Sequence, residues 1–297
     1  MKLGIAIPQT DIGSDPLVIR DFAQAAEATG YQHLATFDHV LGVNVASRPD
    51  WVGPDTSMCV HDPFALLGYL AGQTTRIELS PQVLILPQRQ TALVAKQAAS
   101  VDVLCGGRLR LGVGIGWNSV EYVGLGENYH NRGKRSEEQV AVMKALWADP
   151  QVTFKGTWHN IPDAGINPLP PRRSIPVWFG GGADVVLRRV ARLGDGWILV
   201  NNQPNEKARQ QIQMLRAYGR EAGRDDDHIG IDAWVSMGVR TPKEWREEVE
   251  AWRRLGATHI TLNTHHVVLH HKRIEGTSPD AHLAAMHQFY QAVADLL

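Results

Sequence analysis

Asp38 and His39 are a first pair of residues that could carry chemistry, because they directly follow a short apolar stretch at residues 33–37. An imidazole at a strand end can hydrogen-bond a ring carbonyl or transfer a proton near neutral pH, and the Asp38 carboxylate can fix its tautomer. The spacing fits equally a structural His–Asp pair that caps a loop. Both interpretations stay open for these candidate site residues.

A glycine-rich stretch at residues 112–118 follows another apolar run. Alternate glycines, among them Gly114 and Gly116 beside Trp117, let a backbone approach a ligand closely. The stretch resembles a dinucleotide fingerprint only loosely, since the helix and the downstream acidic residue of that fingerprint are absent from the required places. We therefore reject a dinucleotide site and keep these three residues as candidate ligand contacts.

A second glycine turn, Gly180, Gly181 and Gly182, joins a predicted strand to a predicted helix. Free backbone N–H groups and the helix dipole at such a turn attract an anion such as phosphate. Asp184 opposes this interpretation, because a carboxylate in the first helical turn repels phosphate unless it points to solvent. Asn201, after the next predicted strand, offers an amide donor, although Asn is common in turns.

Pro81 interrupts the third apolar run, within residues 80–84. A proline removes a ladder donor and marks a bulge or distortion, which would give a platform for a flat ring. The alternative is an ordinary strand that ends one turn early.

Four histidines, His265, His266, His270 and His271, invite a metal-site interpretation. Adjacent histidines point different ways in an extended chain, and no carboxylate lies at a recognised ligand spacing. A solvated loop or a pocket lining is favoured, and we predict no metal. The two cysteines, Cys59 and Cys105, are interpreted as a loop thiol and a buried packing residue.

Composition narrows the class of protein. The 297 residues carry 30 Lys and Arg against 31 Asp and Glu, and no basic stripe suited to a phosphate backbone is seen. No apolar run approaches the roughly 18 residues that span a bilayer, and the start Met1–Pro8 is too short for a signal peptide. We expect a cytoplasmic protein that binds neither nucleic acid nor membrane. No nucleophile elbow, phosphate-binding Walker loop or His-Glu-x-x-His motif supports a hydrolase or a phosphoryl transferase.

Short apolar runs alternate with amphipathic stretches along the whole chain, which indicates βα units around a parallel sheet. Eight such units predict an α/β TIM (β/α)8 barrel that forms a single domain over residues 1–297. The predicted strands are Leu3–Pro8, His33–Phe37, Ile77–Leu84, Leu109–Val113, Val177–Phe179, Gly196–Val200, Ile229–Val235 and Thr258–Asn263.

Insertions are expected after strands 2, 4 and 8, at Leu41–His61, Gln151–Arg173 and His265–Pro279. The first is a candidate lid. The second contains a short β-like pair, Val152–Phe154 and Thr157–Asn160. The first helix is predicted to begin at Asp15-Pro16 and to end at Gly30. Its predicted buried stripe is Leu17, Phe22, Ala25, Ala26 and Ala28.

The order of these motifs along the chain resembles that of the luciferase-like monooxygenase superfamily. Within the superfamily, it resembles the branch of coenzyme F420-dependent oxidoreductases. The resemblance covers nearly the whole chain. It rests on residues 4–8, Asp38-His39, residues 75–79, residues 83–89, residues 104–117, Glu121, Gly126, Gly180-Gly181 and residues 194–197.

The resemblance implies that a cofactor ring lies across the barrel mouth and that its tail leaves toward the fifth and sixth strand ends. Similar proteins carry a non-proline cis peptide in the third strand, and the matching bond here joins Gln82 to Val83. His39 then resembles the imidazole near the reactive ring edge. Gly114, Gly116 and Trp117 resemble the wall beside the ring, and Gly180–Gly182 the turn near the phosphate.

The implied function is hydride transfer between the deazaflavin coenzyme F420 and a small organic substrate. Two alternatives stay open. One is an FMN-dependent monooxygenase, which uses oxygen and reduced flavin from a separate reductase, and the other is a non-catalytic flavin-binding barrel. Relatives are commonly homodimers, so the resemblance also implies a homodimer.

Overall fold

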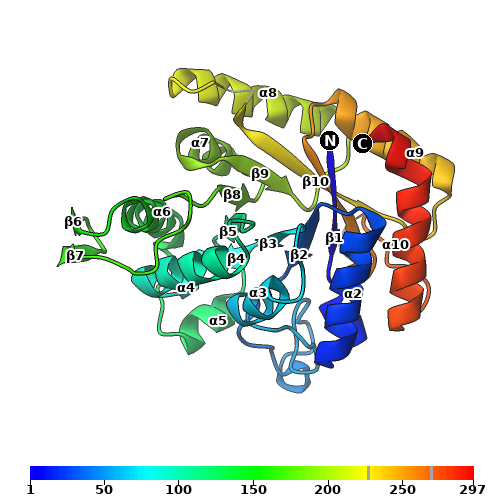
Figure 1. Cartoon of the computed structure of the whole chain (residues 1–297), viewed down its shortest axis with the longest axis horizontal. Coiled ribbons are helices and arrows are strands. Elements are labelled where there is room, and N and C mark those ends of the chain that lie inside the picture. The colour runs from blue at the N-terminus through cyan, green and yellow to red at the C-terminus, as the bar shows by residue number, and fades with distance from the viewer. Residues whose placement is uncertain (226–227, 268–269) are drawn as a thin grey trace.

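The computed structural model describes residues 1–225, 228–267 and 270–297. Its main sheet has nine parallel strands in the order β3-β2-β1-β11-β10-β9-β8-β5-β4, and helices surround it (Figure 1). These strands are β1 Lys2–Ala6, β2 His33–Thr36, β3 Glu78–Pro81, β4 Leu84–Ile85, β5 Leu111–Gly114, β8 Val177–Gly180, β9 Gly196–Leu199, β10 Gly230–Ser236 and β11 His259–Asn263.

The sheet closes into a barrel through its third βα unit. β3 pairs with β2, and a parallel bridge joins its Leu79 to Leu109 just before β5. β4 continues the same unit and pairs with β5. β3 and β4 are thus two halves of one interrupted strand, and the eight predicted strands of the TIM barrel are confirmed.

The interruption is at Gln82 and Val83, which are joined by a cis peptide bond. The expectation of a distorted strand with this non-proline cis bond is confirmed. The alternative, an ordinary strand that ends one turn early, is wrong, because chain pairing resumes at Leu84 opposite Val113.

The helices follow the strands as the periodicity predicts. Their bounds are α1 Gln9–Ile12, α2 Pro16–Thr29, α3 Pro63–Ala71, α4 Thr91–Leu104, α5 Ser119–Gly124, α6 Arg132–Ala148, α7 Asp184–Leu193, α8 Glu206–Glu221, α9 Pro242–Arg254 and α10 Pro279–Val293. The described residues also form short 3-10 turns, η1 Val45–Ser47, η2 Leu86–Gln88 and η4 Ala294–Leu296. None of the helices in the described ranges is long and apolar enough to cross a membrane.

The first long helix, α2, begins and ends where the sequence predicts. The Asp15 side chain caps it by accepting the Leu17 amide, and Gly30 ends it in the left-handed region at φ 112°. The predicted stripe is only partly right. Ile19, Phe22, Ala23 and Ala26 are buried at helical spacing, whereas Leu17 is 55% exposed and Ala28 is exposed as well. Leu17 and Ala28 each lie two residues beyond this buried row, which turns them off its face.

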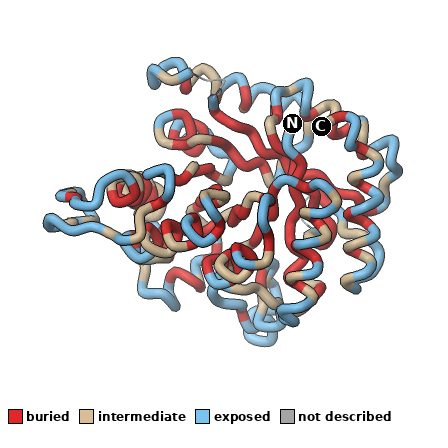
Figure 2. The backbone as a smooth tube through the Cα atoms, viewed as in Figure 1, coloured by how far each residue is buried: buried red, intermediate tan, exposed pale blue. Residues whose placement is uncertain are grey.

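Two apolar layers lie on opposite faces of the sheet. The larger one packs the outward-facing strand residues against the helices, and Figure 2 shows the strands as the buried centre of the molecule. The smaller one fills the barrel interior. It consists of Ala6, Ala35, Trp178, Ile198 and Trp234, with Phe37, Val83 and Val200 packed against it. The interior layer approaches the carboxyl ends of the strands and forms the floor of the barrel mouth.

The three predicted insertions are irregular segments. In the second, a hairpin of β6 Val152–Lys155 and β7 Asn160–Ala164 projects beyond α6 (Figure 1). The predicted second segment, Thr157–Asn160, is wrong, because residues 157–159 form the turn. The Glu138 carboxylate explains this, since it accepts the amides of Thr157, Trp158 and His159. In the third insertion, residues 268 and 269 lie outside the described residues.

Candidate functional site

His39 lies at the carboxyl end of β2, where a barrel of this type places its chemistry. Its Nδ1 atom is 3.4 Å from Oε1 of Glu121, and its side chain is 23% exposed. Glu121 is almost fully buried, and the same oxygen accepts the backbone amides of Val40 at 2.7 Å and Leu41 at 3.3 Å. Because Nδ1 faces this carboxylate, Nε2 is the ring nitrogen that remains for a ligand.

The charge of Glu121 follows from its contacts. Burial raises the pKa of this carboxyl, but the contact with His39 and the two backbone amides outweigh burial, so that the pKa lies below its usual value. Glu121 is therefore ionised throughout the neutral range. A fixed negative charge beside Nδ1 orients the ring.

The expectation that Asp38 fixes the His39 tautomer is wrong. Asp38 accepts hydrogen bonds from the Ile85 amide at 2.7 Å and from Nη2 of Arg89 at 2.7 Å. Burial raises the pKa of Asp38 even against the charge of Arg89. Arg89 also reaches Asp62 at 2.9 Å, so it ties together the two ends of the segment 39–61. Consecutive side chains point to opposite sides of an extended chain, which explains why Asp38 and His39 have different partners.

Glu121 is the site residue that reasoning from spacing missed. Asn118 caps α5, and Glu121 is the third residue after it, which is the spacing of a capping box. That pattern predicts a local role at the helix start. The side chain instead contacts residues 39–41, some eighty positions earlier in the sequence, and only the resemblance to a known family singled it out.

Replacing Glu121 by Gln is expected to lower the free energy of unfolding at pH 7 by about 1–3 kcal/mol, because a charge-assisted acceptor for two amides is lost. The folded pKa of Glu121 is depressed, so its contribution is present above the unfolded value of about 4.3 and disappears as pH falls through the lower folded value. Urea unfolding of both proteins over a pH series measures this. A stability difference that stays constant or grows toward acid would contradict the assignment.

Gln82 turns its side chain into the barrel rather than toward the mouth. Its Nε2 donates to Asp232 Oδ2 at 2.8 Å, and its Oε1 accepts from Trp234 Nε1 at 2.6 Å. Arg110 joins the same carboxylate at 2.9 Å. The side chain of Gln82 is therefore fully used inside the protein, and the half-buried Val83 is what this segment presents near the mouth.

Gly114 and Gly180 are the neighbours of Val83. A Cβ at Gly114 would be 2.4 Å from Val83 Cγ2, and one at Gly180 would be 2.8 Å from Val83 Cγ1. These two glycines are thus required by a protein side chain, which the sequence did not show. Gly116 is different, because its φ of 63° lies in the left-handed region that favours glycine.

Gly114→Ala is expected to destabilise the protein by about 1–3 kcal/mol through overpacking against Val83. Adding Val83→Ala removes the clash, so the double variant is expected to regain melting temperature relative to Gly114→Ala alone. Gly68→Ala is the control, because a Cβ at this helical position meets nothing within 4 Å. A double variant no more stable than Gly114→Ala would refute the explanation.

Trp117 is 53% exposed and stacks on Trp51 with 5.4 Å between ring centroids. Trp51 belongs to the segment Leu41–His61, and its Nε1 donates to the Pro54 carbonyl at 3.1 Å. A Cβ at Gly53 would be 2.3 Å from the Trp117 ring, so glycine permits the close approach. The two indoles join the candidate lid to the end of β5.

The glycine turn at residues 180–182 leads into α7. The helix has Ala183 at its N-cap and no side-chain cap, so its first amides keep no side-chain acceptor. The charge of Asp184 at this helix end is compensated. The carboxylate accepts hydrogen bonds from Arg188 Nε at 2.9 Å and from Tyr218 Oη at 2.5 Å. The repulsion that we expected between Asp184 and an anion at this turn is therefore reduced.

Asn201 is exposed, and a chain of hydrogen bonds from the next residue, Asn202, reaches this turn through Gln211. Asn202 Nδ2 donates to Gln211 Oε1 at 2.8 Å, and Gln211 Nε2 donates to the Gly182 carbonyl at 2.7 Å. Trp197 Nε1 donates to the Gly181 carbonyl at 2.6 Å. These bonds hold the turn by the carbonyls of Gly181 and Gly182.

The histidines after β11 lie at the mouth. His265 and His266 have ring centroids 5.2 Å and 5.6 Å from the Phe37 ring. His271 Nε2 contacts the Val200 carbonyl at 2.5 Å. The His271 ring lies against the His270 ring, with 4.3 Å between the centroids. Among the described residues, no group of three or more His, Cys, Asp or Glu side chains is arranged to hold a metal.

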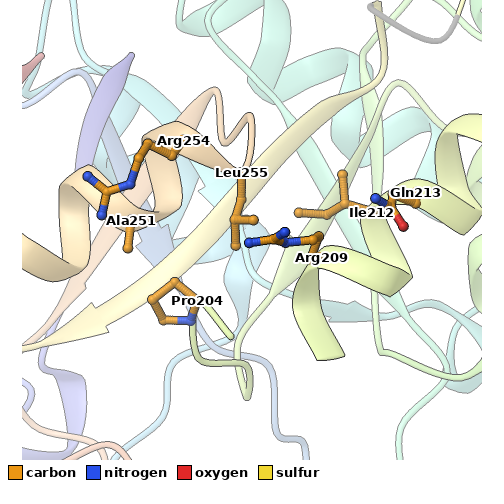
Figure 3. Close-up of a pocket in the computed structure, with 7 residues that line it drawn as sticks. All are labelled: Pro204, Arg209, Ile212, Gln213, Ala251, Arg254 and Leu255. Atoms are coloured by element: carbon orange, nitrogen blue, oxygen red, sulfur yellow. The ribbon is translucent and has the colours of Figure 1, made fainter. Parts of the chain in front are cut away.

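A groove lies away from the strand ends. It has a volume of about 560 Å³, lies between α8 and α9 and is lined by Arg209, Ile212, Arg254 and Leu255 among others (Figure 3). Both arginines have carboxylate partners on their own helices, Glu206 at 3.4 Å and Glu250 at 3.7 Å. The groove contains none of the strand-end residues described above, so it is not the candidate active site.

The closed parallel sheet, with the His39–Glu121 pair near the carboxyl end of β2, defines the molecule as a (β/α)8 barrel. Comparison with known sequences identifies the family. A profile of the luciferase-like monooxygenase family matches residues 2–294, and the chain belongs to that family.

Similar sequences include uncharacterised proteins and FMNH(2)-dependent monooxygenases. An uncharacterised protein of Mycobacterium tuberculosis is 33% identical over 228 residues, which cover 73% of this chain and 78% of that protein. An FMNH(2)-dependent dimethylsulfone monooxygenase of Pseudomonas putida is 28% identical over 73% of this chain, and the match spans 57% of that enzyme's length.

Solved structures with the same fold include an F420-dependent enzyme and a monooxygenase. An F420-dependent secondary alcohol dehydrogenase, bound to an F420-acetone adduct, superposes with a TM-score of 0.80 at 18% identity over 100% of this chain and 99% of that one. The monooxygenase RslO1 from Streptomyces bottropensis gives 0.79 at 18% identity with the same coverage. The relatives and structural neighbours of this chain thus include both an F420-dependent and an FMNH(2)-dependent enzyme.

Proposed function

We propose that the protein is an oxidoreductase that uses coenzyme F420 to transfer hydride to or from a small organic substrate. The observation that carries the proposal is the His39–Glu121 pair, with Nδ1 on a buried carboxylate and Nε2 left for a ligand at the barrel mouth. When bound, the coenzyme supplies the hydride chemistry, and the protein supplies orientation, water exclusion and proton handling.

The residues present fit such a cofactor. The uncapped start of α7, with its carboxylate held by Arg188 and Tyr218, suits the phosphate of a cofactor tail. Val83, flanked by Gly114 and Gly180, gives an apolar surface without competing side chains, which suits a flat ring. Gly116 and Trp117 extend this surface toward the candidate lid.

Each of these side chains has a defined task. An ionised Glu121 favours the tautomer with the proton on His39 Nδ1, so Nε2 accepts a proton or hydrogen bond from the substrate. The stacked Trp51 and Trp117 rings hold the candidate lid at the end of β5. Asp38 acts indirectly, because it accepts the amide of Ile85 in β4 and so holds this short strand in place.

A second candidate is an FMN-dependent monooxygenase, supplied with reduced flavin by a separate reductase. The observation in its favour is that the FMNH(2)-dependent relative is 28% identical, against 18% for the F420-dependent structure. Titration of the full-length protein with F420 and with FMN in parallel, followed by fluorescence quenching, separates the two. Micromolar binding of F420 with none of FMN supports our proposal, and the reverse result overturns it.

A further inference from the structure

The turn after β11 is held rigidly by a buried asparagine. Asn263 Oδ1 accepts the amides of His265 at 3.3 Å and His266 at 2.9 Å, and its Nδ2 donates to the His266 carbonyl at 2.8 Å. All three bonds come from one side chain that is fully buried. These bonds fix the backbone that carries the two histidines.

A second set of contacts fixes the same turn from α10. His282 Nδ1 is 2.9 Å from Thr264 Oγ1, and its Nε2 is 3.1 Å from Asp11 Oδ2. Arg273 pairs with the same carboxylate at 2.7 Å. Both nitrogens of His282 are thus satisfied, as is usual for a buried imidazole.

His265 differs from His282 in this respect. It is 5% exposed, and neither of its ring nitrogens has a hydrogen-bond partner in the part of the chain that the structure describes. A buried polar atom without a partner is costly, and each such case calls for an explanation, which a bound molecule provides. Its ring packs edge-on against Phe37, the inward-facing residue two positions before His39.

The surroundings define what can bind. The groups that act electrostatically on His265 are the imidazoles of His266 and His282 and the guanidinium of Arg273, and burial lowers the pKa of His265 well below its usual value. Burial and the neighbouring His39 lower the pKa of His266 as well. Two neutral imidazoles offer one donor and one acceptor each, and the nearby walls, Phe37 and Trp234, are aromatic.

We propose that His265 and His266 form a subsite that hydrogen-bonds the uncharged carbonyl or hydroxyl oxygen of an otherwise apolar substrate, beside His39. Treating this ligand as the substrate rests on the proposed function. A carboxylate or an ammonium group finds no free opposite charge at these two imidazoles, so the subsite selects against both.

The test uses the full-length protein with ¹⁵N-labelled histidine and cyclohexanone as the neutral probe. Cyclohexanone is expected to shift the ring signals of His265 and His266, which are identified by their loss in His265→Phe and His266→Gln. Cyclohexanecarboxylate and cyclohexylamine, of similar size, are expected to bind at least tenfold more weakly. Cyclohexanone binding to His265→Phe is expected to fall about tenfold, because the ring and its packing remain and only the nitrogens are lost.

Thermal unfolding supplies the matched control. His265→Phe removes two unpartnered nitrogens, so its melting temperature should stay the same or rise, whereas His282→Phe breaks two buried hydrogen bonds and should fall by several degrees. Equal binding of cyclohexanone to His265→Phe and wild type, tighter binding of the carboxylate, or an equal loss of melting temperature in both variants would overturn the subsite. If F420 fails to bind while cyclohexanone still shifts His265, the proposed function fails and the subsite stands.

Discussion

Replacing His39 by Ala is expected to lower kcat about 10²–10⁴-fold, the range that a positioned general acid–base group contributes. Its Nε2 is the one ring nitrogen not directed at Glu121, so the variant loses the proton acceptor at the barrel mouth. The Kd for the coenzyme should change only a few-fold, because the α7 turn and the Val83 surface remain. Steady-state rates and fluorescence titration on the same preparation separate the two effects.

His287→Ala is the control for this experiment, since that histidine is exposed on α10, outside the candidate site. His39→Gln should stay close to His39→Ala in rate, because a neutral amide does not take up a proton near neutral pH. Unchanged coenzyme-dependent turnover in His39→Ala would remove the catalytic assignment. It would also favour the remaining alternative, a flavin-binding barrel without catalysis.

The fold was predictable because the residues that determine each strand and helix lie within that element or directly beside it. Each strand is a short apolar run, and each helix carries its own start and stop residues, as Asp15 and Gly30 show for α2. The errors are residues whose state is set by distant groups. Residues 157–159 form a turn because Glu138 on α6 accepts their amides, and nothing in the local sequence encodes that contact.

The candidate site was predictable only in part, for a related reason. Spacing placed Asp38 and His39 at one strand end, but it assigned the carboxylate partner of His39 to the nearest acid in the chain. The true partner, Glu121, comes from α5, and Asp38 is used by Arg89 and Ile85. In the same way, the need for glycine at 114 and 180 comes from Val83, which lies in the interruption between β3 and β4. Such pairings follow from barrel closure and not from spacing.

The largest effect on stability is expected from Arg110→Met. Arg110 is fully buried between Glu78 at 2.5 Å and Asp232 at 2.9 Å, and its guanidinium lies over the Trp178 ring at 4.4 Å. Burial lowers the pKa of Arg110, but the two carboxylates outweigh it and raise the pKa above its usual value, so the side chain is charged. Removing it leaves Asp232 buried without its cation. The free energy of unfolding should fall by about 3–5 kcal/mol, and the melting temperature by on the order of 10 °C.

Two comparisons make this result specific to a buried pair. Arg209→Met removes an exposed arginine with one surface partner, and it should cost about 0.5 kcal/mol or less. Adding Asp232→Asn to Arg110→Met removes the unpaired charge, so the double variant should be more stable than Arg110→Met alone. Because Asp232 also accepts from Gln82, we expect Arg110→Met to weaken coenzyme binding by displacing the segment that carries Val83. If Arg110→Met unfolds no more readily than Arg209→Met, the network does not support that segment.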